Sequence, residues 1–281
     1  MCMEVSHWKK LLFIIGIDIG SSTTKIVEYK NNEFINRKIY QKNKTVEENL
    51  DDFIKINNIT NIERFVLTGI GADKIDLVNY NVPVKSVEEF VAIATGGKCL
   101  SGKQEAIVVS VGTGTALIKV TPEEIKHLGG TGVGAGTLLN LCNRILDVKS
   151  FNDILELSKR GDLSKIDLRI GDVTNQEIET LPKDLTLSNF GKFEIDSKKE
   201  DIVLGILNMI FEVIGMMAVF ATQNLDIKDI VVIGNITVIP VVKDIIEKLE
   251  KLHKVNFILS DDAEFAVVIG AIKKVLENDF I

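Results

Sequence analysis

Short apolar runs separated by polar turns fill the first part of the chain. The runs at 13–19, 25–29 and 34–40 are joined by a Gly-Ser-Ser-Thr turn and by Asn31-Asn32, a pattern typical of an antiparallel meander. The elements expected after it are a helix at 45–56, a strand at 65–68, an extended piece at 82–84 and a helix at 86–100.

The same strand–turn–strand pattern returns in the second half. A strand at 106–111, a Gly-Thr-Gly-Thr turn at 112–115 and a strand at 116–120 repeat the opening of the chain. Such self-similarity predicts a duplicated lobe. The 281 residues suffice for two domains of ordinary size. We therefore expect lobes at 1–100 and 101–281.

Helical and strand patterns alternate through the rest of the chain, which indicates an α/β fold. The expected elements are a glycine-rich loop at 129–136, helices at 137–147 and 151–160, a polar loop at 161–195, a long helix at 201–224, a strand at 230–233, a helix at 238–252, a strand at 255–259 and a helix at 264–277.

The net charge and the cysteine positions limit the classes of partner and the compartment that we expect for this chain. The formal net charge of −7 argues against nucleic acid or an anionic membrane as a partner, since both usually require a basic surface. The three cysteines, Cys2, Cys99 and Cys142, are too few and too scattered for a disulfide framework. These features favour a small-molecule ligand and a reducing cytoplasm.

Two apolar stretches resemble membrane or export signals. The run at 11–15 follows two lysines, but Gly16 and Asp18 interrupt it, which favours a buried strand over a leader peptide. The stretch at 203–221 is nearly long enough to span a bilayer. Asn208 and Glu212 lie inside it, so we expect a buried helix between the lobes or between subunits.

Two hydroxyl-rich turns are candidate phosphate-binding sites. The first follows Asp18, which we expect to hold Mg²⁺ through water; it contains Gly20, Ser21, Ser22, Thr23, Thr24 and Lys25. The second contains Thr113 and Gly114. Turn N–H groups, hydroxyls and a lysine together can hold a polyphosphate, although one such turn alone is equally an ordinary hairpin. A P-loop motif is absent from the sequence.

A third candidate is the glycine-rich segment His127–Gly136. It precedes an expected helix, whose N-terminus would offer N–H groups and a favourable dipole to an anion. Its match to a dinucleotide-binding motif is weak, because no suitable strand and acidic residue accompany it.

These segments together resemble actin-like ATPases and, within that superfold, the type II pantothenate kinases. The resemblance covers nearly the whole chain. Its specific parts are RGDLSKIDLRIGDV (160–173) and LPKDLTLSNFGK (181–192), which accompany GIDIGSSTTKIVE (16–28), VEEFVAIATG (87–96) and SVGTGTALI (110–118).

The resemblance implies two actin-like (ribonuclease H-like) α/β lobes with ATP and Mg²⁺ in the cleft between them. It implies phosphorylation of pantothenate, the first step of coenzyme A biosynthesis, by a homodimer built around the helix at 201–224. The catalytic base would be Glu89, chosen over Glu88 because it directly precedes the phenylalanine of the family motif. The implied ATP contacts are the residues of both turns together with Ala135, Gly136, Thr137, Leu138, Leu139, Phe151, Gly234 and Asn235.

One position departs from the family pattern. The family usually has an arginine before the glycine-rich run, on the pantothenate side, whereas this chain has His127 preceded by Lys126. Histidine offers no bidentate fork and is mostly neutral at pH 7. Either Lys126 compensates or the acceptor differs from pantothenate.

Three other functions remain open. The opening segment also resembles ATPase activators of 2-hydroxyacyl-CoA dehydratases, but those need a cysteine pair per subunit for a shared iron–sulfur cluster. A sugar or N-acetylhexosamine kinase would use an aspartate base and often a zinc motif, and we find neither in the sequence. A non-catalytic protein that binds ATP or acyl-CoA is the third alternative; the presence of Asp18, Lys25 and Glu89 speaks against it.

Overall fold

The computed structural model describes residues 13–176, 182–223 and 225–279. The described chain forms two compact units, Met1–Cys99 with Phe265–Ile281, and Leu100–Glu264. The leader-like start, including Cys2, and residues 177–181 of the expected polar loop lie outside the described residues.

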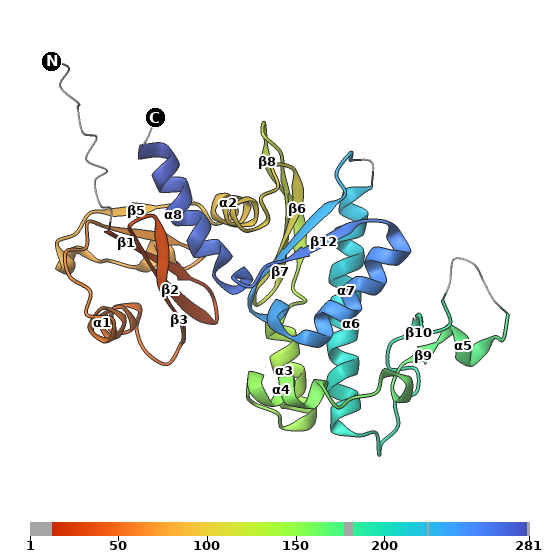
Figure 1. The fold of residues 1–281 in the computed structure, drawn as a ribbon. Helices are drawn as coiled ribbons and strands as arrows, with labels where there is room; N and C mark the ends of the chain where they lie inside the picture. Colours follow the sequence, from red (N-terminus) through yellow and green to blue (C-terminus); the bar gives the residue numbers. More distant parts are fainter. Residues whose placement is uncertain (1–12, 177–181, 224, 280–281) are drawn as a thin grey trace. The chain divides into compact units, whose positions relative to one another are not determined.

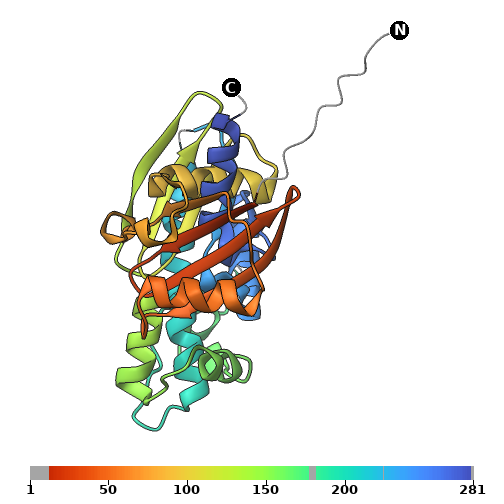
Figure 2. The ribbon, with the colours of Figure 1, turned by 90° about the vertical axis from the view of Figure 1, so that its left-hand side faces the viewer.

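The first unit is a five-stranded sheet with helices on both faces (Figure 1 and Figure 2). Its strand order is β3-β2-β1-β4-β5; β1 pairs antiparallel with β2 and parallel with β4. The strands are β1 (Phe13–Ile19), β2 (Thr23–Lys30), β3 (Glu33–Gln41), β4 (Arg64–Thr68) and β5 (Val84–Ser86). The helices are α1 (Val46–Ile56), α2 (Glu89–Ser101) and α8 (Ala266–Asp279).

Alternation along β1 decides which helix covers which face of this sheet. Ile15, Ile17 and Ile19 belong to one buried cluster with Leu50 and Phe53 of α1. Thr45 and Glu48 form a capping box at the start of that helix, which explains why it begins there. The intervening β1 residues, among them Gly16 and Asp18, point to the opposite face.

Helix α8 covers that opposite face and packs on β1, β2 and β4. A Cβ atom at Gly16 would lie 2.6 Å from Ile272 of this helix, so glycine permits the close contact. The sequence assigned 264–277 to the second lobe with everything after residue 100. That assignment differs from the structure, because a continuous α/β alternation does not reveal that the chain returns to the first sheet.

The second unit repeats the topology of the first. Its five-stranded sheet has the order β12-β11-β6-β7-β8, in which β6 pairs antiparallel with β7 and parallel with β11. The strands are β6 (Ala106–Val111), β7 (Thr115–Val120), β8 (Ile125–Thr131), β11 (Asp229–Ile233) and β12 (Asn256–Leu259). The larger helices are α3 (Ala135–Leu146), α4 (Phe151–Ser158), α6 (Lys199–Thr222) and α7 (Pro240–His253).

Helix α6 is the core helix of this unit, and its length and composition would suffice to cross a membrane. In the structure, 72% of its most apolar window is buried. It packs against α3, α4, α7 and the sheet (Figure 1). The expectation of burial between lobes was therefore wrong for most of the helix, which is buried within its own unit.

Two polar residues inside the apolar stretch of α6 anchor the expected polar loop. Asn208 Nδ2 donates to Asp167 Oδ2 at 2.9 Å, and Asn189 Nδ2 donates to Glu212 Oε2 at 2.8 Å. The loop contains the short strands β9 (Leu168–Arg169) and β10 (Thr186–Ser188), which pair with one another, and α5 (Ile170–Val173). The family-specific sequence here has a clear structural role, namely attachment of this segment to α6.

Candidate functional site

The turn between β1 and β2 is the first expected phosphate-binding turn. The Gly20 N–H donates to the Thr23 carbonyl at 3.0 Å, which closes the turn. Ser21 and Ser22 are exposed at its tip, whereas Thr24 and Lys25 are buried in β2. The turn therefore presents hydroxyls to solvent, and the strand that follows it contains the buried Lys25.

Asp18 and Lys25 face each other at the base of this turn. They are cross-strand partners, and Lys25 Nζ lies 3.8 Å from Asp18 Oδ2. Burial raises the pKa of Asp18, while the charge of Lys25 acts in the opposite direction. A buried carboxylate and ammonium next to a hydroxyl-rich turn can bind a metal-bound phosphate, because both charges then acquire closer partners.

The end of β4 lies against Asp18, which the sequence did not reveal. Thr68 is the parallel partner of Asp18, and it is completely buried. Gly69 has φ +93°, and a Cβ atom there would lie 2.6 Å from Asp18 Oδ1. The available signal was Thr-Gly at the end of a buried strand, a position where glycine permits close backbone approach.

Glu88 and Glu89, at the start of α2, have different surroundings. The Glu88 carboxylate is exposed and accepts the Val91 N–H at 3.0 Å, which caps the helix. Glu89 is half-buried in the first turn of α2. Burial raises the pKa of Glu89, and the negative charges of Asp18 and Glu88 raise it further. Glu89 is thus the carboxylate whose pKa is raised by the charge of Asp18, and a raised pKa suits a general base.

The second turn packs tightly against the start of α3. The N–H groups of Ala135 and Gly136 donate to the carbonyls of Gly112 and Thr113 at 2.8 and 3.0 Å. A Cβ atom at Gly134 would lie 2.8 Å from three carbonyl oxygens of the turn. The expected turn and the expected glycine-rich segment therefore form one compact element.

This packing changes what α3 can bind. Two of its N-terminal N–H groups are used by the turn, and the Gly134 N–H donates to Thr137 Oγ1 at 3.3 Å. These three N–H groups are therefore not free to bind an anion, and the anion site expected at this helix end stays a prediction. Along the rest of the expected contact, Leu138 is buried and Leu139 packs against the core.

The segment after β11 is a second glycine-dependent element. Gly234 has φ +126°, and a Cβ atom there would lie 2.1 Å from the Val111 carbonyl oxygen. Asn235 follows, and its Oδ1 is buried without a hydrogen-bond partner in the described structure. Phe151, another expected ATP contact, begins α4 and packs against the core of the unit.

Lys126 and His127 lie on β8, a strand that was not expected from the sequence and that overlaps the expected glycine-rich loop at 129–131. The pairing with β7 places Lys126 opposite Lys119, and His127 opposite Ile118. Successive side chains of a strand point to opposite faces, so Lys126 cannot take the place of His127. Both residues are exposed.

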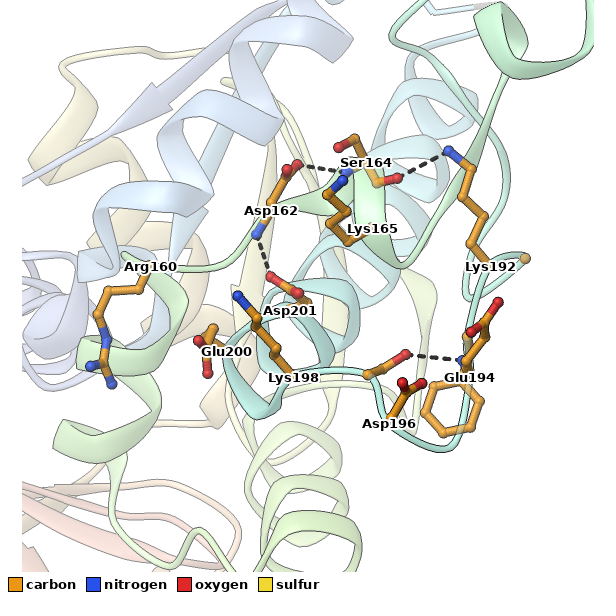
Figure 3. Close-up of a pocket in the computed structure, with 13 residues that line it drawn as sticks. Arg160, Asp162, Ser164, Lys165, Lys192, Glu194, Asp196, Lys198, Glu200 and Asp201 are labelled. Atoms are coloured by element: carbon orange, nitrogen blue, oxygen red, sulfur yellow. Dashed lines mark hydrogen bonds between the residues drawn. The ribbon is translucent and has the colours of Figure 1, made fainter.

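Figure 3 shows a charged pocket of about 800 Å³ beside the N-terminus of α6. It contains none of the expected site residues. Asp162 links two parts of its wall: its N–H donates to Asp201 Oδ1 at 2.7 Å, and its carboxylate accepts the Ser164 N–H at 2.9 Å. The wall contains both cations and carboxylates, and this mixture selects no ligand charge; they are Arg160, Lys165, Lys192, Lys198, Asp162, Glu194, Asp196, Glu200 and Asp201.

The described residues fit ATP with Mg²⁺. Thr68 Oγ1 and Asn235 Oδ1 are buried and lack hydrogen-bond partners among the described residues; Thr68 is the strand partner of Asp18, and Asn235 follows Gly234. Buried polar atoms without partners are rare and need an explanation, and a bound ligand or ion is one. Within the described ranges no cluster of three metal-binding side chains exists. Mg²⁺, which keeps several waters and needs only one or two carboxylates, is compatible with Asp18 alone.

Comparisons with known proteins agree with this architecture. A family model described as Fumble matches residues 101–248. Type II pantothenate kinases of Bacillus cereus (strain ATCC 14579) and Bacillus anthracis are 27% and 28% identical over 79% of this chain, covering 83% and 82% of their own lengths.

Two solved structures are similar in fold. The Acidaminococcus fermentans (R)-2-hydroxyglutaryl-CoA dehydratase component A has a TM-score of 0.62 at 17% identity, covering 92% of this chain and 96% of its own. The ROK hexokinase of Thermus thermophilus has a TM-score of 0.56 at 10% identity, covering 95% of this chain and 100% of its own. At these identities the likeness concerns the fold alone.

Proposed function

This chain belongs to the Fumble family, and on that premise we propose that it transfers the γ-phosphate of ATP to the 4′-hydroxyl of pantothenate, the first step of coenzyme A biosynthesis. The observation that carries the proposal is the extended similarity to type II pantothenate kinases, over 79% of the chain. Glu89 and Asp18, coupled through their charges in the first unit, supply the chemistry that such a transfer requires.

We assign the catalytic roles as follows. The Glu89 carboxylate accepts the proton of the acceptor hydroxyl, whose oxygen forms a bond to the γ-phosphorus while the bond to the β-phosphate oxygen breaks and ADP leaves. Lys25 and the turn at Gly20 hold the phosphates. Mg²⁺, held by Asp18 through water, would neutralise phosphate charge when bound.

The second unit is proposed to complete nucleotide binding. Thr113 and Gly114 lie in its turn. The Gly112 and Thr113 carbonyls of this turn accept hydrogen bonds from the N–H groups of Ala135 and Gly136 at the start of α3. We therefore assign Ala135, Gly136 and Thr137 to contacts with the uncharged part of ATP, through Cα and side-chain atoms. The unpartnered Asn235 Oδ1 is an acceptor suited to a ribose hydroxyl or an adenine amino group.

His127 is proposed as the acceptor-side contact. A neutral imidazole can donate one hydrogen bond to a carboxylate or amide oxygen, which is a weaker contact than an arginine fork. Since Lys126 points to the opposite face of β8, His127 must make this contact without it.

The dehydratase-activator alternative is disfavoured by Cys142. This thiol is fully buried in α3, and burial raises its pKa to about 11. A ligand of a cluster shared between subunits must be accessible at the surface, and the Cys142 thiol is 0% exposed. The protein is proposed to act in the cytoplasm, where ATP and pantothenate are available.

We also propose a homodimer that uses the free side of α6. Met209, Val213, Met216 and Phe220 follow one another at spacings of four, three and four residues, and none of them is buried; Val213 is 42% and Phe220 58% exposed. This spacing gives one apolar stripe, the pattern by which two helices pack together. The buried residues of α6 pack within its own unit, and the stripe is proposed to pack against the partner copy.

Val213→Asp is expected to convert the dimer into a monomer, because it would bury an unpaired charge in the interface. Sedimentation velocity at micromolar concentration measures this. Ile145→Asp on α3 is the matched control, since Ile145 is 55% exposed in the same unit and lies off the stripe. A Val213→Asp protein with unchanged mass would remove the stripe as the interface.

The proposed activity is tested by ADP release from Mg·ATP with pantothenate, with N-acetylglucosamine and without acceptor. Pantothenate is expected to stimulate ADP release by at least about 100-fold over the acceptor-free rate, since ordered attack by a bound hydroxyl replaces chance hydrolysis. Equal rates in the three reactions would contradict the proposed function.

A further inference from the structure

Thr68 has a buried hydroxyl for which the described residues offer no hydrogen-bond partner, next to the proposed metal-binding carboxylate. The residue is 0% exposed and ends β4, where it is the parallel neighbour of Asp18. Registered neighbours in a parallel sheet project to the same face, so the Thr68 and Asp18 side chains share one side of the sheet. Because Thr68 Oγ1 lacks a partner, the fold of the first unit carries an unsatisfied donor here.

Strand propensity alone does not account for threonine at this position. Valine has the same branching and nearly the same volume, and it would leave no buried polar atom unsatisfied. Val66 occupies the equivalent position one pair earlier on the same face, beside Gly16. An apolar residue is therefore acceptable on this face, and the hydroxyl has to be explained by something other than packing.

A change of partners at Asp18 supplies the explanation. In the structure, Asp18 has Lys25 at 3.8 Å as its counter-ion. A phosphate bound at the first turn competes for Lys25, because phosphate oxygens are the stronger acceptors. Asp18 then needs another donor on its own side of the sheet, and a threonine hydroxyl can rotate to provide one.

We propose that Thr68 is a positioning residue, whose hydroxyl donates to Asp18 in the Mg·nucleotide-bound protein and orients that carboxylate toward the metal's water shell. Gly69 assists by geometry: at φ +93°, with no Cβ atom, it lets the chain pass against Asp18 Oδ1. This inference rests on the proposed function, since it assumes that Mg·ATP binds at the first turn.

The test compares Thr68→Val with Thr68→Ser. Thermal unfolding is measured for each protein alone, and the dissociation constant for AMP-PNP is measured with Mg²⁺ and with EDTA. In Thr68→Val the ligand-free protein is expected to melt a few degrees higher than wild type, because an unsatisfied buried hydroxyl is removed. Its affinity for Mg·AMP-PNP is expected to fall about 10-fold, with the affinity in EDTA unchanged. Thr68→Ser, which keeps the hydroxyl, should bind Mg·AMP-PNP within about twofold of wild type.

The outcomes separate three possibilities. A wild-type protein that binds no nucleotide would overturn the proposed function together with this inference. Wild-type binding with an unaltered Mg²⁺ dependence in Thr68→Val would overturn the inference alone. A Thr68→Val protein that melts lower and binds more weakly in both Mg²⁺ and EDTA would show a purely structural threonine, which also overturns it.

Discussion

Glu89→Gln is expected to lower kcat by about 10² to 10⁴-fold, because glutamine cannot accept the proton of the acceptor hydroxyl. Nucleotide affinity should stay near the wild-type value, since the substitution preserves shape and leaves the two turns intact. Steady-state kinetics with pantothenate and equilibrium binding of AMP-PNP measure the two quantities separately. In the wild-type protein, kcat should rise with pH as Glu89 loses its proton, above the range of an exposed glutamate, because burial and Asp18 raise its pKa.

Glu88→Gln is the matched control. It makes the same chemical change one residue earlier, at a carboxylate that caps α2 by accepting the Val91 N–H. Loss of the charge weakens this cap, so a small decrease in melting temperature is expected with kcat within a fewfold of wild type. If Glu88→Gln abolished turnover and Glu89→Gln did not, the two roles would have to be exchanged.

The strands and helices with strong periodicity were predictable from the sequence. Residues 13–19 and 106–111 were expected as strands and are strands with those bounds. They are fully apolar or nearly so, and turn residues limit them on the C-terminal side. The repeat of strand, turn and strand also indicated the duplicated topology, which the two sheets have.

Strand β8 was missed because Gly129 and Gly130 weaken a strand pattern and suggest a loop. The duplication itself contained the missing signal, since β3 of the first unit requires a third antiparallel strand in the second. A Cβ atom at Gly130 would lie 2.3 Å from the Thr115 carbonyl oxygen. Glycine is thus needed for close strand contact, which composition alone cannot distinguish from loop flexibility.

The sequence proposes the residues of the candidate site, but it does not reveal their hydrogen bonding. Sequence pattern identified Asp18, Lys25 and the two turns. It could not show that the Ala135 and Gly136 N–H groups are used by the carbonyls of the second turn, nor that Thr68 lies beside Asp18. Both facts depend on which segments meet in three dimensions, and no periodicity along the chain records such pairings.

Asp18→Asn is expected to reduce turnover by about 10²-fold or more and to remove the effect of Mg²⁺ on nucleotide affinity, because an amide is a far poorer partner for the metal's waters than a carboxylate. Turnover and AMP-PNP binding across a Mg²⁺ titration measure this. Glu28→Gln is the control: it neutralises a second buried carboxylate, which lies on β2 and is paired with Asn36 away from the turn, and it should leave the Mg²⁺ dependence unchanged.

The same substitution should change the stability of the ligand-free protein in a pH-dependent way. Burial raises the folded-state pKa of Asp18 above its unfolded value, so the folded state binds its proton more tightly. The contribution of this group to stability is therefore present at low pH and is lost as the pH rises through the raised pKa. Asparagine has no such loss, and the melting temperature of Asp18→Asn relative to wild type should increase between pH 4 and pH 7. A relative decrease over that interval would mean that the Lys25 pair outweighs the burial of Asp18, and that the carboxylate is held by the fold rather than kept available for the metal.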